Sequence, residues 1–275
     1  NKMLDLAVNE IKRIEKLLTT FDENSQTNQI NQQAGVTPVK VDAEVFGLIE
    51  RSIRISAITD GAFDITYGSV DKKLWNFDQT MNVLPSAAQA KSMVRLINYQ
   101  NIILNKEECS VMLKEAGMRL GFGGIGKGYA AEMAKALLIK EGVKSGIVNA
   151  SGDLTTWGNQ PNGKQWTIGI VDPEHKNQAF SYMNVSNIAV ATSGNYEKYV
   201  MIDGVKYSHT INPKTGLPQK SAMLSATVLA PKCIEADGYA TAFMVMDIES
   251  IQKLLQRRKD LYVLLIYTDE QHQVK

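Results

Sequence analysis

The chain has 275 residues, of which 44% are hydrophobic and 21% charged, and its formal net charge at pH 7 is +1. This is the composition of a globular protein with enough chain for a substantial core, built as one large domain or as two fused lobes. The small net charge argues against a broad electrostatic grip on nucleic acid, and no run approaches the roughly 18 apolar residues of a membrane span. Two cysteines, Cys109 and Cys233, are too few for a disulfide scaffold, and the sequence leaves open whether they pair.

The first hundred residues are predicted to be mainly helical. Apolar residues at helical spacing predict an amphipathic helix over residues 3–19. The stretch 21–35 is rich in Asn, Gln and Ser and is predicted to be a loop. A helix with Asp42 as its N-cap is expected to run to about residue 57, and a Ser–Gln capping box predicts another over 86–97.

Short strands dominate the rest of the chain. They are predicted at 102–104, 111–113, 119–122, 145–150, 154–157, 166–171, 180–185, 188–192, 224–230 and 261–267. An Asp-Gly turn predicts a hairpin over 196–209, followed by a turn at 212–216. Helices are expected at 234–246 and 250–257. Antiparallel-looking strands with helices in blocks predict an α+β fold, with antiparallel-rich mixed sheets and flanking helices.

A glycine-rich stretch at 121–128 precedes a run of helix formers that is expected to end near Gly142. Glycine tolerates positive φ and lets backbone N–H groups approach a ligand, and the helix start and Lys127 add positive charge. The stretch therefore predicts a pyrophosphate cradle. A tight strand-to-helix turn without a ligand explains the same glycines. A Walker loop is excluded because Gly128 stands where Ser or Thr would follow the lysine, and a dinucleotide fingerprint fits poorly.

Two oxygen-bearing side chains share one face of the predicted helix 234–246. Asp237 and Thr241 are four residues apart, so they lie about one turn from each other. A carboxylate and a hydroxyl suit Mg²⁺, which prefers oxygen ligands and completes its coordination with substrate phosphates. The alternative is an acidic residue that favours the helix dipole beside a half-buried threonine.

Three further positions carry side chains with chemical potential. His209, one of three histidines, ends a predicted strand before a turn, where a general base would be useful; a structural histidine is the alternative. Asp64 either accepts hydrogen bonds from a ligand or caps a turn. Ser193, in a Thr-Ser-Gly stretch after a strand, offers a hydroxyl and N–H groups.

Motifs in almost the whole chain, taken in order, resemble those of the ApbE family of FAD:protein FMN transferases. They are T-D-G-A-F-D-I-T at 59–66, G-G-I-G-K-G-Y-A at 123–130, N-A-S-G-D at 149–153, T-S-G-N-Y-E at 192–197, Y-S-H-T-I-N-P-K-T-G at 207–216 and A-D-G-Y-A-T-A at 236–242. The resemblance implies one ApbE-like domain over 1–275, with two closely packed lobes as an alternative. It also implies that the family's opening strand lies before residue 1.

The resemblance implies transfer of FMN from FAD to a threonine hydroxyl of a partner flavoprotein, with Mg²⁺ as cofactor and AMP as the leaving group. Asp237 and Thr241 would bind the metal together with main-chain oxygens near Gly124 and Ala240. His209 would be the base for the incoming threonine. The implied FAD contacts are Phe21, Ala62, Phe63, Asp64, Lys127, Ser193 and Ile211.

The sequence departs from the family pattern at Gly121, where the family usually has an acidic residue, and at Gly126, which replaces alanine. Gly121 favours a first alternative, an FAD-binding protein without transfer activity. A second alternative is an Mg²⁺-dependent FAD pyrophosphatase that gives FMN and AMP. The family also implies a periplasmic location through a lipid anchor on a cleaved N-terminal segment. No nucleic-acid partner is expected.

Overall fold

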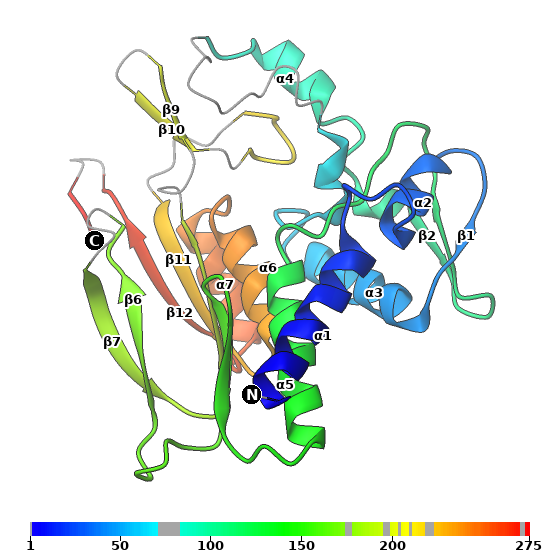
Figure 1. Ribbon diagram of the computed structural model, residues 1–275. Coiled ribbons are helices and arrows are strands. Elements are labelled where there is room, and N and C mark those ends of the chain that lie inside the picture. The colour runs from blue at the N-terminus through cyan, green and yellow to red at the C-terminus, as the bar shows by residue number, and fades with distance from the viewer. Residues whose placement is uncertain are drawn as a thin grey trace. The chain divides into compact units, whose positions relative to one another are not determined.

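The computed structural model describes residues 2–70, 83–173, 178–194, 199–202, 205–208, 211–217, 223–269 and 273–275 (Figure 1). The chain forms two compact units, each assembled from segments far apart in the sequence. Unit 1 comprises Asn1–Ile14, Ile125–Glu197 and Ser221–Lys275. Unit 2 comprises Glu15–Gly124 and Lys198–Lys220. Helix α1 (Lys2–Leu18) contributes residues to both units.

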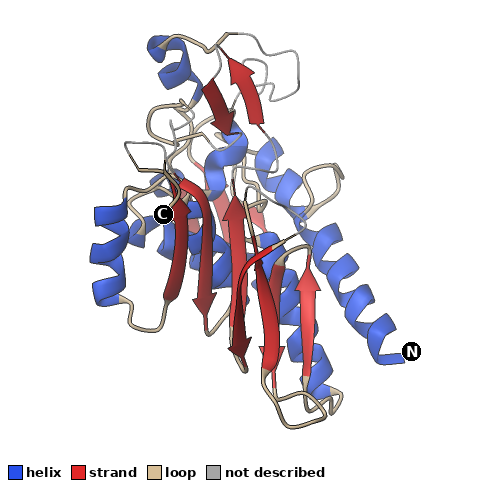
Figure 2. Ribbon diagram, turned by 90° about the vertical axis from the view of Figure 1, so that its left-hand side faces the viewer, coloured by secondary structure: helices blue, strands red, loops and turns tan. Residues whose placement is uncertain are grey.

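Unit 1 contains a five-stranded antiparallel sheet in the order β12-β11-β8-β5-β4 (Figure 2). Its strands are β4 (Gly146–Ala150), β5 (Asp153–Trp157), β8 (Ala189–Gly194), β11 (Met223–Ala230) and β12 (Tyr262–Tyr267). Strands β6 (Trp166–Val171) and β7 (Ala179–Val185) form a separate antiparallel pair. Strand β5, which lies between β8 and β4, is buried along its whole length.

Two helices of unit 1 pack on this sheet and on each other. Helix α5 (Gly126–Lys140) contacts β4 and β5, and helix α6 (Cys233–Phe243) contacts β5, β8 and β11 (Figure 1). Helix α7 (Ile248–Arg257) is amphipathic and buries Ile251 and Leu254.

The contact between α5 and α6 is closest at Gly128. A Cβ atom placed on Gly128 would lie 2.4 Å from the Cys233 carbonyl oxygen and 2.7 Å from Asp237 Cβ. No side chain fits there without displacing backbone, because both distances are below van der Waals contact. The glycine at this position is therefore required by the packing of the two helices.

Unit 2 combines short helices with small sheets. Its helices are α2 (Gln26–Gln32), α3 (Ala43–Ile58) and α4 (Ala87–Met93), with 3-10 turns η1 (Ile65–Ser69) and η2 (Tyr99–Asn101). One antiparallel sheet has the order β1-β3-β2, formed by Val39–Lys40, Ser110–Leu113 and Ile102–Asn105. The second is the pair β9 (Tyr199–Ile202) and β10 (Val205–Ser208). The apolar face of α3 supplies much of the core, with Val45, Leu48 and Ile49 fully buried.

Helix α2 lies inside the stretch 21–35, so the prediction of a loop there is wrong. Its N-cap Ser25 accepts a hydrogen bond from Asn28 N. Asn28 Nδ2 donates to the carbonyls of Thr20 and Asp22, at 2.9 and 2.7 Å. The side-chain amide of Asn28 is buried because backbone carbonyls accept its hydrogen bonds. Polar residues in this stretch therefore form hydrogen bonds inside the protein instead of facing solvent.

The predicted strand at 119–122 is also absent from the structure. The side chain of Asn31 accepts from Leu120 N at 2.6 Å and donates to Leu120 O at 3.1 Å. Gly121 N donates to Ile65 O at 2.9 Å. The segment forms its hydrogen bonds with an amide side chain and with the 3-10 turn η1 instead of with a strand.

Most other predicted elements are confirmed with small shifts of their ends. The Ser86–Gln89 capping box is present, although α4 ends at Met93 rather than near residue 97. Gly142 follows α5 with φ +87°, as expected for a helix C-terminus. Strands β9 and β10 pair as predicted, while the Asp203-Gly204 turn lies outside the described residues. Both cysteines are free thiols.

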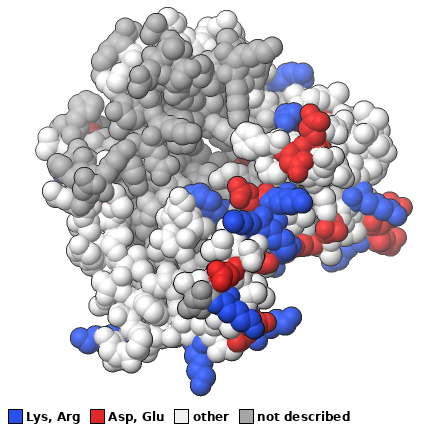
Figure 3. Space-filling model, viewed as in Figure 1, with Lys and Arg blue, Asp and Glu red and all other residues white. Residues whose placement is uncertain are grey.

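Charged side chains of both signs lie side by side on the described surface in the view of Figure 3. On α1, for example, Arg13 Nη2 lies 2.8 Å from Glu10 Oε1. Such exposed pairs contribute little to stability. Within the described part of the chain, no helix is both long enough and apolar enough to cross a membrane.

Candidate functional site

An ion pair with one buried partner joins the start of α5 to the start of β5. Lys127 Nζ, in the first turn of α5, lies 2.7 Å from Asp153 Oδ2. Asp153 is 1% exposed and is the first residue of β5. It follows a tight turn in which Ser151 and Gly152 both have positive φ, and Asn149 Oδ1 accepts from Gly152 N at 2.8 Å. The turn fixes the backbone position of Asp153 at the start of β5.

A second buried carboxylate, Asp237 on α6, belongs to the same charged cluster. It is 3% exposed, and its Oδ2 accepts a hydrogen bond from Gly128 N at 2.9 Å. Burial, followed by the nearby carboxylate of Asp153, raises the pKa of Asp237 to about 7. The Gly128 N–H and the Lys127 charge oppose this shift. Two acidic groups are therefore held close together where water does not screen them.

The donor set around Asp237 suits a hard divalent cation. Thr241 lies one turn further along α6, so a hydroxyl and two carboxylates come from neighbouring elements. A cation would offset the repulsion between Asp153 and Asp237 that raises the pKa. In the described residues, no three or more His, Cys, Asp or Glu side chains gather in a way that could hold a metal. The remaining ligands of such a site would be hydroxyl and main-chain oxygens, as predicted for Gly124 and Ala240.

The structure shows one role of the glycine-rich stretch, in the packing of α5. None of its five glycines, all of which are described, has a positive φ. Helix α5 begins at Gly126 without a side-chain N-cap, and the N–H of Gly128 is used by Asp237. At least one glycine is thus needed for helix packing and for orienting a carboxylate. The phosphate-binding role of the stretch stays a prediction.

Helix α6 is held at its outer side by an arginine. Arg258 Nη1 donates to Tyr239 Oη at 2.6 Å, and Nη2 donates to Glu235 Oε2 at 3.1 Å. Tyr239 is fully buried, and burial raises its pKa to about 12. Tyr239 lies between Asp237 and Thr241 in the helix, so these contacts fix the rotation of α6 about its axis.

Ser193 is placed on β8 of unit 1, half-buried and opposite Ala226 of β11. Its neighbour Thr192 shares a hydrogen bond of 2.9 Å with Thr227. The strand rather than the loop after it carries both hydroxyls. His209, the predicted base, lies outside the described residues.

In unit 2 the structure supports the capping interpretation of Asp64. This carboxylate is the N-cap of η1: Oδ1 accepts from Thr66 N and Thr66 Oγ1, at 2.8 and 2.7 Å, and Oδ2 accepts from Tyr99 N at 2.8 Å. Burial raises the pKa of Asp64, and the three hydrogen bonds oppose that shift. Both oxygens therefore serve the fold, and a contact with FAD stays a prediction.

The other predicted FAD residues of unit 2 differ in exposure. Phe63 is buried, with its N–H donating to Thr59 Oγ1 at 3.2 Å, whereas Ala62 is half-buried. Phe21, in the loop after α1, is 96% exposed and so is open to a flat partner. Ile211 is 2% exposed, and its N–H donates to the hydroxyl of Tyr67 at 3.2 Å.

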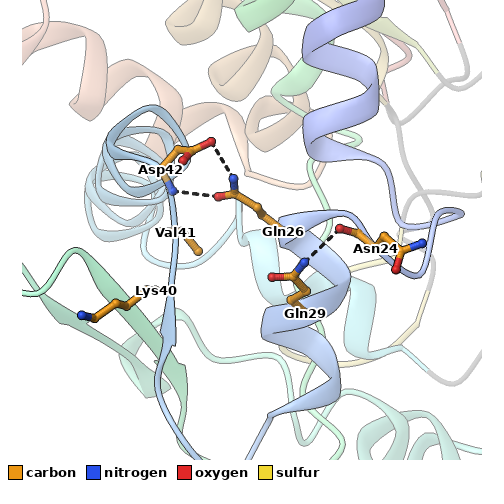
Figure 4. Close-up of a pocket in the computed structure, with 6 residues that line it drawn as sticks. All are labelled: Asn24, Gln26, Gln29, Lys40, Val41 and Asp42. Atoms are coloured by element: carbon orange, nitrogen blue, oxygen red, sulfur yellow. Dashed lines mark hydrogen bonds between the residues drawn. The ribbon is translucent and has the colours of Figure 1, made fainter.

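Unit 2 also carries a shallow depression of about 380 Å³, lined by Asn24, Gln26, Gln29, Lys40, Val41 and Asp42 (Figure 4). Gln26 donates to Asp42 Oδ2 at 2.6 Å and accepts from Asp42 N at 2.8 Å. Its amide and the carboxylate thus bind each other, as the dashed lines show (Figure 4). The depression contains none of the predicted site residues.

Asp153 and Tyr67, which contact the predicted site residues Lys127 and Ile211, were not part of the site prediction. Asp153 belongs to the N-A-S-G-D motif, whose last position is an acid that begins a buried strand. A charged residue at the edge of an apolar strand was the available signal. Nothing in the sequence indicated Tyr67, because its partner is 144 residues away.

Comparison with known proteins places this arrangement in a family. The model of the ApbE family matches residues 2–265. The chain belongs to the ApbE family. A Klebsiella pneumoniae relative named FAD:protein FMN transferase is 32% identical over 257 residues, which cover 93% of this chain and 79% of the relative. An Escherichia coli relative of the same name is 31% identical and is covered over 73% of its length, with 92% of this chain aligned.

Solved structures agree with this assignment. The ApbE protein of Thermotoga maritima superposes with a TM-score of 0.88 at 29% identity, covering all of this chain and 88% of that one. The Pseudomonas stutzeri flavinyl transferase ApbE gives a TM-score of 0.83 at 27% identity, with 97% and 84% covered. The predicted α+β class with antiparallel sheets is confirmed, and the ApbE-family chain is a transferase enzyme.

Proposed function

We propose that this ApbE-family protein transfers FMN from FAD to a threonine hydroxyl of an acceptor flavoprotein and releases AMP. The name shared by its relatives supports the flavin donor and acceptor. The observation that carries the proposal is the cluster of Lys127, Asp153 and Asp237, in which buried opposite and like charges lie beside one another. Such clusters are typical of active sites, where a ligand offsets their cost.

Asp237 and Thr241 would hold Mg²⁺, together with main-chain oxygens of Gly124 and Ala240. The ion would neutralise charge on the diphosphate of FAD as the bond to AMP breaks. Asp237 is prepared for this role by the Gly128 N–H, which fixes one carboxylate oxygen. The ordered carboxylate needs no rearrangement to bind a cation.

Lys127 would add a second positive charge at the diphosphate, since its ammonium is held at the start of α5. His209 would accept the proton of the acceptor threonine as its oxygen attacks phosphorus, with AMP as the leaving group. Phe21, with its exposed ring, would stack on the donor nucleotide. The remaining residues proposed for FAD binding are Ala62, Phe63, Asp64, Ser193 and Ile211.

Asp64 would act on FAD mainly by fixing the backbone that precedes η1. Its oxygens accept three hydrogen bonds from unit 2, so the main chain at Ala62 and Phe63 is held in one conformation. A rigid segment binds a ligand with a smaller loss of conformational entropy.

One observation favours a second function, FAD binding without transfer. Gly121 offers no side chain where an acidic residue is expected. A Cβ added there would make only an ordinary contact, at 3.8 Å from Gly68 Cα. The absence of a carboxylate is therefore not imposed by packing. A periplasmic location with a lipid anchor is part of the proposal and rests on the family resemblance alone.

The test is incubation with FAD, Mg²⁺ and an acceptor flavoprotein in its apo form, whose threonine carries FMN in the mature protein. Covalent flavin fluorescence on the acceptor and release of AMP are expected. Free FMN with AMP would instead identify a pyrophosphatase, and unchanged FAD a binding protein. Asp237→Asn is expected to lower transfer by about 100-fold or more, because the main metal ligand is lost. Glu249→Gln, on the exposed face of α7, is the control and should transfer at the wild-type rate.

A further inference from the structure

The ion pair between Lys127 and Asp153 combines one exposed and one buried side chain. The Lys127 side chain is 47% exposed, whereas the Asp153 side chain is 2% exposed. A lysine side chain has four rotatable bonds and loses about 2 kcal/mol of rotamer entropy when it is fixed. The geometry assigns Asp153 the part of a positioning residue, which holds the Lys127 ammonium where the diphosphate of FAD binds. This inference rests on the proposed function.

The backbone around Asp153 makes it a rigid anchor. Asp153 pairs with Ala150 across the β4–β5 turn, and the following residues of β5 are buried. Two residues of the turn, Ser151 and Gly152, have positive φ, and Asn149 caps it with a hydrogen bond to Gly152 N. The turn therefore fixes the backbone that carries the carboxylate. The carboxylate in turn determines where the Lys127 ammonium lies.

Burial alone does not explain a charge at Asp153. Its side chain is 2% exposed and lies 2.7 Å from the ammonium of Lys127, whose side chain is 47% exposed. A neutral side chain of equal size would preserve the packing of β5. The charge at this position therefore serves the ammonium that it holds.

A structural ion pair and a positioning pair make opposite predictions for Asp153→Asn. If the pair only holds α5 on β5, the substitution lowers stability and activity together. If Asp153 positions Lys127, transfer falls while the thermal midpoint stays unchanged, because the half-exposed ammonium of Lys127 can be hydrated when the pair is lost. We expect the second result, with kcat/KM for FAD reduced about tenfold or more.

The experiment is a double-mutant cycle of Asp153→Asn and Lys127→Met, with FMN transfer and thermal unfolding measured for each variant. In the Lys127→Met background, Asp153→Asn is expected to change kcat/KM less than about twofold, because its effect passes through the lysine. Equal effects in both backgrounds would overturn the inference. A midpoint lowered in proportion to the lost activity would also overturn it. Glu249→Gln serves as the matched charge-removal control.

A second readout does not depend on transfer. Acetic anhydride labels lysines, and mass spectrometry follows the labelling of Lys127. FAD with Mg²⁺ is expected to protect Lys127 in the wild type and to protect it much less in Asp153→Asn. Equal protection in both proteins would overturn the inference. A wild type that protects Lys127 but transfers no FMN would overturn the proposed function alone.

Discussion

Asp64 in unit 2 and Asp237 in unit 1 are both buried, but their surroundings differ. Asp64 in unit 2 accepts three hydrogen bonds from Thr66 and Tyr99, which use both of its oxygens. Asp237 in unit 1 accepts from Gly128 N and lies near the charge of Asp153. Burial raises the pKa of both groups, but only for Asp237 does a neighbouring carboxylate add to the effect.

The difference separates a structural acid from one kept for a ligand. Hydrogen-bond donors stabilise the ionised form of a buried carboxylate, so the three donors around Asp64 reduce the cost of its burial. A second carboxylate destabilises the ionised form, and the cost is recovered only when a cation binds. The predictions for Asp237→Asn, for Mg²⁺ and for Asp64→Asn test this contrast.

The largest effect is expected for Asp237→Asn in metal-free protein. Because folding raises the pKa of Asp237 from 3.8 to about 7, the folded state holds its proton more tightly than the unfolded state. The wild type therefore loses stability as the pH rises through this window, and the asparagine variant does not. The variant should become more stable relative to wild type by on the order of 2–4 kcal/mol at neutral pH. Urea unfolding between pH 4 and pH 8 measures it.

Magnesium should reverse that difference. Excess Mg²⁺ is expected to stabilise the wild type at neutral pH and to leave Asp237→Asn unchanged, because the cation binds only the ionised carboxylate. If the difference in unfolding free energy between wild type and Asp237→Asn did not change with pH, Asp237 would be a structural group, as Asp64 is.

Gly128→Ala should give the next largest effect. The added Cβ would meet backbone at the Cys233 carbonyl, so α5 and α6 must move apart, at a cost of about 1–3 kcal/mol. Gly123→Ala is the matched control, since nothing lies within 4 Å of its Cβ and its φ is not positive. Thermal unfolding compares them. Equal midpoints would show that the helices are not closely packed at Gly128.

Asp64→Asn is expected to cost about 1–2 kcal/mol, because an NH₂ group would replace one oxygen that accepts a backbone N–H. Unlike Asp237→Asn, the variant should be less stable than wild type at neutral pH, with or without Mg²⁺. The exposed Asp60→Asn, which breaks an ion pair with Lys214, is the control and should leave the urea midpoint unchanged. Unchanged stability with weakened FAD binding would instead assign Asp64 to the ligand.

The sequence was sufficient where local chemistry determines structure. The capping box at Ser86, the glycine after α5 and the apolar spacing of α1 each act within a few residues, and each was predicted. It was insufficient where a distant partner decides. Helix α2 was missed because its buried Asn31 binds the backbone of Leu120, 89 residues away.

The same limit applies to the site. Asp237 and Thr241 were predicted because helical spacing puts them on one face, and Lys127 because it stands in the glycine-rich stretch. The role of Asp153 was not predicted, since its partner Lys127 lies on another element. The close approach at Gly128 likewise depends on α6, more than 100 residues later in the chain.

The order of segments in unit 1 has a consequence for biosynthesis. Strands β4 and β5 and helix α5 leave the ribosome before residues 221–275, which supply β11, α6 and β12. Until residues 221–275 are synthesised, the surfaces of β5 and β8 that contact α6 and β11 in the folded protein stay exposed. Chains that stop before residue 233 would carry Lys127 and Asp153 but not α6, and we expect them to be recognised by chaperones and degraded.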